Sequence, residues 1–184
     1  MESLVTQRLI IRHPRKDDLA DFLAYQTHPE SLKYQPVAPL TEGAAERFLS
    51  RMAATEIGED GGYVMFAVEL RGEGRMIGEV GINRLPEPQS KGEVGWSLHP
   101  AYWGHGYATE AAQALLEFGF AQWNLHRVTS ACDTRNAASF RLLERLGMRR
   151  EGHLRQSQLT HGVWRDEYLY ALLRDEWLSR QRAA

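Results

Sequence analysis

The sequence is poor in several features that define whole classes of protein. It has one cysteine, Cys132, and only three lysines against nineteen arginines, and its formal net charge is −2 over 184 residues. A single cysteine cannot form an intramolecular disulfide or a zinc site built from several thiolates. Nearly balanced charge is untypical of proteins that bind nucleic acid or a membrane surface, so we expect neither partner.

Long apolar runs are missing as well. No stretch approaches the roughly 18 apolar residues of a membrane-spanning helix, and the first residues lack the basic and apolar segments of a signal peptide. The length and a hydrophobic content of 43% suit a single domain over residues 1–184 with its own core. We therefore expect a single-domain, cytoplasmic protein.

The spacing of apolar residues predicts a mixed α/β domain around one central sheet, in the order β-α-α-β-β-β-α-β-α-β-β. Asp17 or Asp18 is expected to cap the first helix and Thr41 the second, while Gly147 should end the helix that starts at Asn136. A short terminal helix is expected over 175–182. Strands are expected over residues 8–12, 63–70, 76–85, 93–98, 127–132, 149–158 and 164–173.

The segment from Glu93 to Ala111 predicts a strand, a sharp turn and a helix. Gly104 and Gly106 let the backbone turn so that several N–H groups face one point, and the start of the helix adds unpaired donors and a positive dipole end. This arrangement suits a phosphate, although an ordinary strand–helix connection would use the same glycines. Thr109 breaks the dinucleotide fingerprint, and the chain has no Gly-Lys pair for a P-loop.

Two separated motifs carry a family resemblance. Residues 103–110 read Trp-Gly-His-Gly-Tyr-Ala-Thr-Glu, and residues 136–148 contain Asn-Ala-Ala-Ser followed by Leu-Glu-Arg-Leu-Gly-Met. Together with Thr-Gln-Arg-Leu at 6–9 and Trp-Arg-Asp at 164–166, they resemble the acetyl-CoA-binding core of the GNAT superfamily of N-acetyltransferases, closest to its RimJ/RimL branch, which acetylates ribosomal-protein N-termini. The resemblance covers nearly the whole chain. It implies a mostly antiparallel sheet, flanked by helices, whose parallel strands 93–98 and 127–132 splay apart.

The resemblance also implies acetyl-CoA as cosubstrate. No metal is expected, because the histidines show no metal-ligand spacing. In the family's pyrophosphate loop, Arg/Gln-x-x-Gly-x-Gly/Ala, Trp103 departs from the wider pattern at the first position. This departure matters little because backbone N–H groups hold the phosphates. Leu98 and His99 would pair with the pantetheine arm as a strand does, and the Asn136 amide would bind the same arm. The implied loop residues are Trp103, Gly104, His105, Gly106, Tyr107, Ala108 and Thr109.

Acyl transfer from a thioester to an amine needs a neutral amine, a polarised carbonyl and a proton for the leaving thiolate. Many family members supply that proton from a tyrosine at the position of Leu143, which cannot donate one. The resemblance implies Ser139 as the substitute acid, or else as a small residue packed against the cosubstrate. Glu93 is the first candidate for the base and Glu79 the second, although either could be a solvated strand residue.

We therefore expect an enzyme that moves acetyl directly to a primary amine in a ternary complex, with a protein N-terminus, such as that of a ribosomal protein, as acceptor. The alternatives are a small-molecule amine (a polyamine or an aminoglycoside) and a non-catalytic acyl-CoA-binding module. The protein is expected to be a monomer or a homodimer. Cys132 ends a strand beside the expected thiol of CoA, so oxidation is expected to join the two in a mixed disulfide.

Overall fold

The computed structural model describes residues 3–55, 62–85 and 90–183. Its strands are β1 (Leu4–Val5), β2 (Leu9–Arg12), β3 (Gly62–Leu70), β4 (Arg75–Arg84), β5 (Lys91–Leu98), β6 (Arg127–Asp133), β7 (Arg149–Thr160) and β8 (Val163–Leu173). Its α-helices are α1 (Leu19–Gln26), α2 (Pro29–Leu32), α3 (Glu42–Ala54), α4 (Tyr107–Gln122), α5 (Ala137–Arg145) and α6 (Arg174–Ala183), with short 3₁₀ helices η1 (Lys16–Asp18) and η2 (Pro100–Tyr102).

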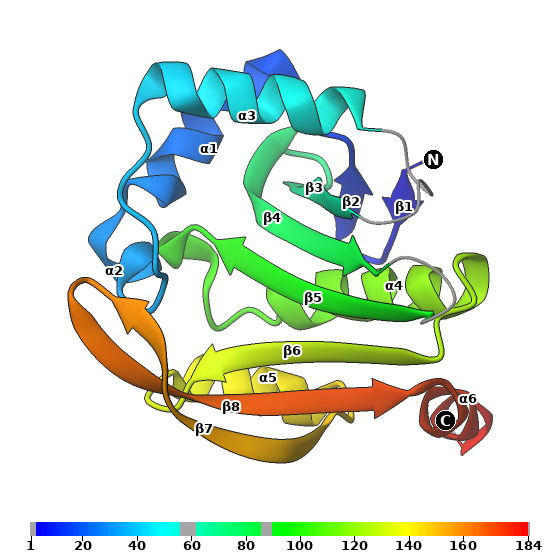
Figure 1. Cartoon of the computed structure of the whole chain (residues 1–184). Helices are drawn as coiled ribbons and strands as arrows, with labels where there is room; N and C mark the ends of the chain where they lie inside the picture. The colour runs from blue at the N-terminus through cyan, green and yellow to red at the C-terminus, as the bar shows by residue number, and fades with distance from the viewer. Residues whose placement is uncertain (1–2, 56–61, 86–89, 184) are drawn as a thin grey trace.

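Within the described residues, eight strands form one sheet in the spatial order β1-β2-β3-β4-β5-β6-β8-β7 (Figure 1). Neighbouring strands are antiparallel, except that β5 and β6 run parallel. This topology confirms the single sheet that the sequence pattern predicted and the one parallel pair that the family resemblance implied.

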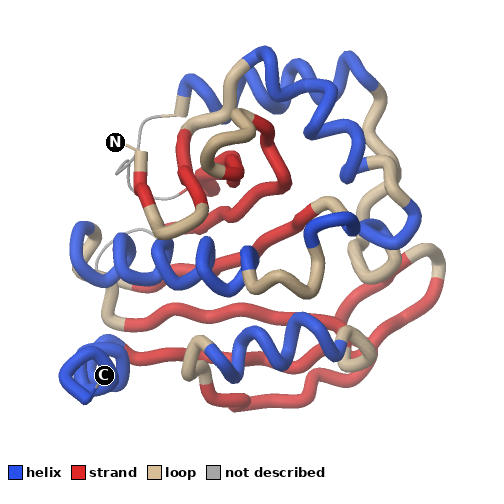
Figure 2. Tube along the Cα trace, turned by 180° about the vertical axis from the view of Figure 1, so that it is seen from behind, coloured by secondary structure: helices blue, strands red, loops and turns tan. Residues whose placement is uncertain are grey.

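Helices cover both faces of the sheet, and the side chains of β3 show how the two faces are divided. Successive side chains along a strand point to opposite faces. Met65 and Ala67 pack in the smaller core with α1 and α3, whereas Phe66 and Val68 pack in the larger core with α4. Figure 2, seen from behind, shows α4 and α5 lying across the face with the larger core.

Local signals set several helix ends as predicted. The Thr41 hydroxyl accepts a hydrogen bond of 3.4 Å from the Ala44 N–H at the start of α3. The Asn136 side chain caps α5, and Gly147 follows this helix with φ +83°. Asp18 precedes α1 as expected, but the predicted capping is wrong because its side chain makes no cap bond to the helix.

The Asp18 carboxylate belongs instead to a buried charge network around Arg12. Arg12 donates hydrogen bonds of 2.7 and 2.8 Å to Asp18 and one of 2.5 Å to Glu69, and its side chain is only 4% exposed. Burying a charge is tolerated when oppositely charged partners compensate it. The network therefore ties β2 to β3 and to the segment that leads into α1.

Two short elements, β1 and α2, were not predicted. α2 lies in a proline-rich stretch, where Pro29 takes a first-turn position that needs no N–H donor. The imidazole of His28 accepts the Glu30 N–H at 3.2 Å and completes the cap. β5 begins at Lys91, two residues before the predicted start, while residues 86–89, between the predicted strands 76–85 and 93–98, lie outside the described residues.

The last two strands form a long hairpin whose tip reaches α2 (Figure 1). His161 and Gly162 both have positive φ, at 49° and 77°, as a two-residue turn of matching twist requires. The His161 Nε2 atom is hydrogen-bonded to the Leu32 carbonyl oxygen at 3.0 Å. The hairpin therefore spans the end of the sheet at which β5 and β6 diverge.

Candidate active site

The parallel strands β5 and β6 pair only near their starts. Their register runs from Lys91 opposite Arg127 to Glu93 opposite Thr129, whereas β5 continues to Leu98 and β6 to Asp133. Figure 1 shows the two strands diverging toward their C-terminal ends. The backbone of β5 beyond Glu93 is thus open on its β6 side, which suits an extended chain carrying amides.

Leu98 and His99 lie at the open end of β5, and their backbone groups point in opposite directions. The His99 N–H donates to the Ile77 carbonyl on β4 at 2.9 Å, so it faces away from the opening. Because backbone groups alternate along an antiparallel pair, those of Trp96 and Leu98 face the opening. The expected strand-like pairing with a pantetheine arm is therefore compatible with Leu98 but not with the His99 N–H.

Trp103 holds the turn after β5 in place. Its indole N–H donates to the Leu98 carbonyl oxygen at 2.7 Å, and 46% of the residue is exposed. The indole N–H is therefore used in a hydrogen bond within the chain. Trp103 thus replaces the arginine or glutamine of the family pattern with a group that anchors the loop to β5.

The turn before α4 depends on two glycines in the left-handed region. Gly104 has φ +80° and Gly106 has φ +82°, and a non-glycine residue would be strained at either position. The Gly106 carbonyl accepts the first bond of α4 from the Glu110 N–H at 3.0 Å. The preceding N–H groups, including those of Tyr107, Ala108 and Thr109, have no carbonyl partner within the helix, and the helix dipole makes this end positive. The turn is therefore suited to an anion such as a phosphate.

Asn136, Ser139 and Leu143 occupy α5 or its cap. The Asn136 Oδ1 accepts the Ser139 N–H at 3.2 Å, which leaves Nδ2 as the amide atom for a ligand. Ser139 is half-buried. Leu143 is fully buried in the larger core, so the family's tyrosine position supplies no proton donor in this chain.

Glu79 lies on β4 directly opposite Ser97 of β5. Its carboxylate accepts hydrogen bonds from the Tyr25 hydroxyl at 2.9 Å and from the Gln26 amide at 3.3 Å, both on α1. Burial raises the pKa of Glu79 to about 7, and these two hydrogen bonds oppose the rise in part. Such a group is divided between its acid and base forms at neutral pH, as a general base needs.

Tyr63 flanks Glu79 from β3. A Cβ at Gly81 would lie 2.2 Å from the Tyr63 hydroxyl, so the missing side chain of Gly81 makes room for this ring. Burial and then the nearby Glu79 charge raise the pKa of Tyr63, which keeps its hydroxyl protonated. Glu79 is therefore hydrogen-bonded to one tyrosine and close enough to a second to affect its pKa, and neither tyrosine was predicted to belong to the site.

Glu93, the first candidate for the base, lies elsewhere. It is exposed and sits in the paired part of β5, opposite Thr129. It lies four positions before Ser97, which is roughly 13 Å along an extended strand. The structure therefore places Glu79, and not Glu93, beside the point where β5 and β6 have diverged.

Cys132 is half-buried on β6. Burial, and then the charges of Asp133, Glu167 and Glu144, raise the pKa of the Cys132 thiol to about 11. Very little reactive thiolate is present at pH 7, and this opposes the predicted mixed disulfide with CoA.

Arg145 is the neighbour of the glycine turn on the α5 side. Its Nη2 lies 3.4 Å from the Thr109 hydroxyl, and both residues line an open groove of about 900 Å³.

Within the described ranges, no group of three or more His, Cys, Asp or Glu side chains is arranged to hold a metal ion. In the same part of the chain, no helix is long and apolar enough to cross a membrane.

Residues 8–149 match the family model described as the acetyltransferase (GNAT) domain. The chain belongs to the GNAT family of N-acetyltransferases. It is 35% identical over 174 residues to the uncharacterized N-acetyltransferase YnaD of Bacillus subtilis (strain 168), with 95% of this chain and 98% of that protein covered. The crystal structure of a GNAT-family acetyltransferase from Bacillus anthracis matches with a TM-score of 0.83 at 33% identity, covering 95% of this chain and 99% of that one.

A further relative of this GNAT enzyme has a named acceptor. The ribosomal protein uS5-alanine N-acetyltransferase of Escherichia coli (strain K12) is 27% identical over 180 residues, with 95% of this chain and 92% of that protein covered. Family membership makes this protein an N-acetyltransferase and implies acetyl-CoA as the acetyl donor. The glycine turn and the open stretch of β5 fit that donor, because they offer backbone N–H groups to its phosphates and its amides.

Proposed function

We propose that this GNAT enzyme acetylates the α-amine of a protein N-terminus, by direct attack on acetyl-CoA in a ternary complex. The observation that carries the proposal is the position of Glu79, held by Tyr25 and Gln26 opposite Ser97 where β5 and β6 diverge, with its pKa raised by burial to about 7. An α-amine has a pKa near 8, whereas a lysine amine has one near 10.4. A base with a pKa near that of Glu79 is therefore better matched to an α-ammonium than to a lysine ammonium.

The donor would be held by backbone groups on both sides of the turn. Within the loop 103–109, the N–H groups of residues 104–109 would bind the pyrophosphate. The Leu98 backbone and the Asn136 Nδ2 atom would bind the pantetheine arm in the opening between β5 and β6. When bound in this way, acetyl-CoA supplies an activated acetyl thioester where the strands diverge.

The remaining steps are assigned to side chains of this chain. Glu79 would take the proton from the acceptor ammonium, while Tyr25 and Gln26 hold its carboxylate in place. As the C–N bond forms and the C–S bond breaks, the Ser139 hydroxyl would give its proton to the departing thiolate and take up the proton that the attacking nitrogen loses, so that Ser139 ends unchanged. Holding amine and thioester together supplies a further part of the rate, because a bimolecular reaction becomes effectively intramolecular. We place Glu79 in the role for which Glu93 was the first candidate.

A pair of peptides tests the acceptor. One begins with a free alanine or serine and contains an internal lysine, and its matched control has the same sequence with a blocked N-terminus. The enzyme is incubated with each peptide and acetyl-CoA, and release of free thiol is measured. We expect turnover of the free peptide alone. Equal turnover of the two peptides would assign the acceptor to lysine and overturn the proposal.

The two alternative functions are separated by a second measurement. Radiolabelled acetyl-CoA is added with the enzyme to a size-fractionated lysate, and CoA binding is measured by calorimetry. Label in protein fractions supports the proposal, whereas label confined to small molecules indicates a polyamine or an aminoglycoside acceptor. Binding of acetyl-CoA without release of thiol by any amine would indicate a non-catalytic module.

A further inference from the structure

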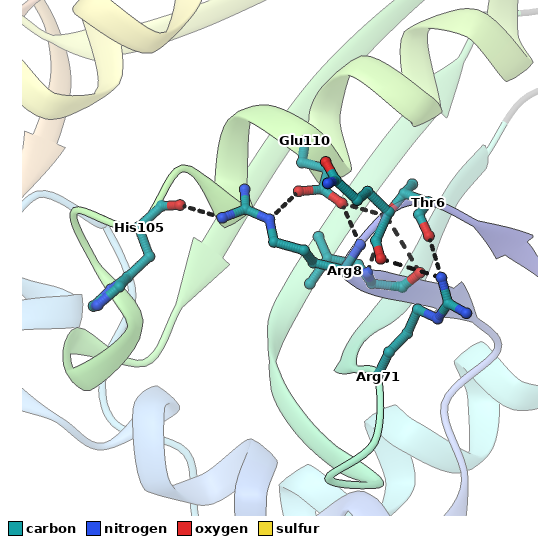
Figure 3. Close-up of polar contacts among 7 residues, drawn as sticks. Thr6, Arg8, Arg71, His105 and Glu110 are labelled. Atoms are coloured by element: carbon teal, nitrogen blue, oxygen red, sulfur yellow. Dashed lines mark hydrogen bonds and ion pairs between the residues drawn. The ribbon is translucent and has the colours of Figure 1, made fainter.

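Arg8, the residue before β2, reaches the glycine turn from the far end of the chain (Figure 3). Its Nη1 donates to the His105 carbonyl oxygen at 2.9 Å. Its Nε donates to the Glu110 carboxylate at 2.7 Å. One guanidinium therefore bridges the turn and the first turn of α4, with its two bonds fixed relative to each other because the group is planar.

Glu110 is a fixed anchor for this bridge. Its carboxylate also accepts the Thr6 hydroxyl at 2.6 Å and the Arg8 N–H at 2.8 Å. Burial alone would raise the pKa of Glu110, but the hydrogen bonds from Thr6 and Arg8 outweigh it and lower this pKa. The carboxylate is thus ionised at neutral pH, and it lies in the first turn of a helix, where negative charge is favourable.

The backbone of the anchoring segment is held separately. Arg71 Nη1 donates to the carbonyl oxygens of Thr6 and Gln7, at 2.9 and 3.1 Å. Figure 3 shows Arg71 on the side of this segment away from His105. Arg71 therefore stabilises the same segment without touching the glycine turn, and it can serve as a matched control.

The bond to His105 sets the direction of the next N–H group. In a planar trans peptide the C=O and the following N–H point in opposite directions. With the His105 carbonyl fixed on Arg8, the Gly106 N–H must point away from Arg8. Arg8 also packs against the turn itself, because its Nη2 lies 3.4 Å from where a Cβ on Gly106 would be.

We propose that Arg8 is a positioning residue that orients the Gly106 peptide of the turn to receive the pyrophosphate of acetyl-CoA. The inference rests on the proposed function, which places the phosphates at this turn. Arg8 would act through the His105 carbonyl and not on the reacting atoms. Its removal should therefore weaken a donor that carries phosphates and leave a donor without them unaffected.

The experiment compares two acetyl donors in three variants. Acetyl-CoA carries the pyrophosphate, and S-acetylpantetheine is the same thioester without it. We expect Arg8→Gln to lower kcat/KM for acetyl-CoA by about tenfold, through KM and with kcat little changed, and to leave kcat/KM for S-acetylpantetheine unchanged. Arg71→Gln should leave the preference for acetyl-CoA as in the wild type.

Arg8→Lys separates positioning from stability. A lysine ammonium can pair with Glu110, but it cannot span both Glu110 and the His105 carbonyl as the guanidinium does. We expect Arg8→Lys to recover the melting temperature of the wild type but not its KM for acetyl-CoA. Full recovery of KM would overturn the proposal.

Different outcomes would overturn the role of Arg8 and the placement of the phosphates at the turn. An equal loss with both donors in Arg8→Gln, or an equal loss with acetyl-CoA in Arg71→Gln, would show a general structural role and overturn the proposal. A wild-type enzyme without preference for acetyl-CoA over S-acetylpantetheine would overturn the placement of the phosphates at the turn. A wild-type preference that Arg8→Gln leaves intact would overturn the role of Arg8 alone.

Discussion

The hydroxyl of Tyr25 on α1 donates a hydrogen bond of 2.9 Å to the carboxylate of Glu79 on β4. Tyr25 is fully buried, and its hydrogen bond joins α1 directly to the Glu79 carboxylate on the sheet. A hydrogen bond donated to a carboxylate favours its charged form. The position of α1 therefore controls how readily Glu79 ionises.

Replacing Tyr25 should shift the pH dependence of the enzyme. In Tyr25→Phe the bond that lowers the Glu79 pKa is lost, so that pKa should rise above its present value of about 7. The acid limb of kcat against pH, measured at saturating substrates, should move upward by roughly one unit. Tyr102→Phe is the control, since the Tyr102 ring packs beside His99 and not on Glu79. If the acid limb does not move in Tyr25→Phe, Glu79 is not the group whose ionisation sets the pH dependence of kcat.

The two candidate bases can be compared directly. Glu79→Gln should lower kcat at pH 7 by about a hundredfold or more, because the amide cannot accept the ammonium proton. Glu93→Gln should change kcat little, since Glu93 is exposed in the paired part of β5. A large loss in Glu93→Gln with none in Glu79→Gln would restore Glu93 as the base.

The raised pKa of Glu79 also predicts how stability varies with pH. The folded state holds this proton up to about pH 7, whereas an unfolded glutamate releases it near 4.5. The folded state therefore binds more protons between these values, and the contribution of Glu79 to stability falls as pH rises through the window. Relative to the wild type, Glu79→Gln should gain stability in urea denaturation between pH 5 and pH 8. A difference in unfolding free energy between Glu79→Gln and the wild type that stays constant over this pH range would contradict the raised pKa of Glu79.

The glycine turn should be far less tolerant than another turn with the same backbone conformation. Gly106 has φ +82° and Arg8 against its Cβ position, while Gly72 has φ +86° and open space around it. Valine at either position should cost about 1–2 kcal/mol of local strain. Only Gly106→Val should also abolish measurable binding of CoA in calorimetry, because the turn must move. Retained affinity would show that the phosphates bind elsewhere.

The charge network around Arg12 should matter for stability and not for catalysis. Arg12→Leu leaves Asp18 and Glu69 buried without their partner, which should cost about 3–5 kcal/mol in urea denaturation. Arg75→Leu is the matched control, because Arg75 is largely exposed and its ion pair with Asp21 should contribute little. Equal losses in the two variants would contradict this distinction.

Cys132 should react slowly with thiol reagents. With the pKa of Cys132 raised to about 11, the thiolate is scarce at pH 7. As long as the pH stays below this pKa, the thiolate fraction rises tenfold with each unit by which the pH rises. The rate of modification by a disulfide reagent should follow that slope up to pH 9. Rapid modification at pH 7, or an adduct with CoA in the intact mass after mild oxidation, would instead support the mixed disulfide expected from the sequence.

The sequence predicted those parts of the fold that depend on neighbouring residues. The Thr41 cap, the start of α5 at Asn136 and the glycine after α5 all depend on residues within one turn of chain, and each is found as expected. The residues of the glycine turn were likewise recognised, because a strand–glycine–helix pattern is local. The orientation of their N–H groups was not, since it depends on the distant Arg8.

Long-range pairing accounts for what the sequence did not reveal. Glu79 and Glu93 look alike as strand glutamates, and only the register of β4 on β5 places one beside Ser97 and the other opposite Asn83. The Asp18 carboxylate looked like a helix cap because its attraction to Arg12 requires the fold to exist first. Tyr25 carries no signal of its partnership with Glu79, which lies 54 residues away.

The short register between β5 and β6 has a consequence for engineering. From Val94 to Leu98, β5 has an unpaired edge in the middle of the sheet, of the kind that other sheets show only at their outer strands. Substitutions that extended the pairing past Thr129 would add hydrogen bonds and stabilise the fold, and they would close the space where the donor has to lie. Stability and activity are therefore opposed along this stretch, and a search for thermostable variants should leave it alone.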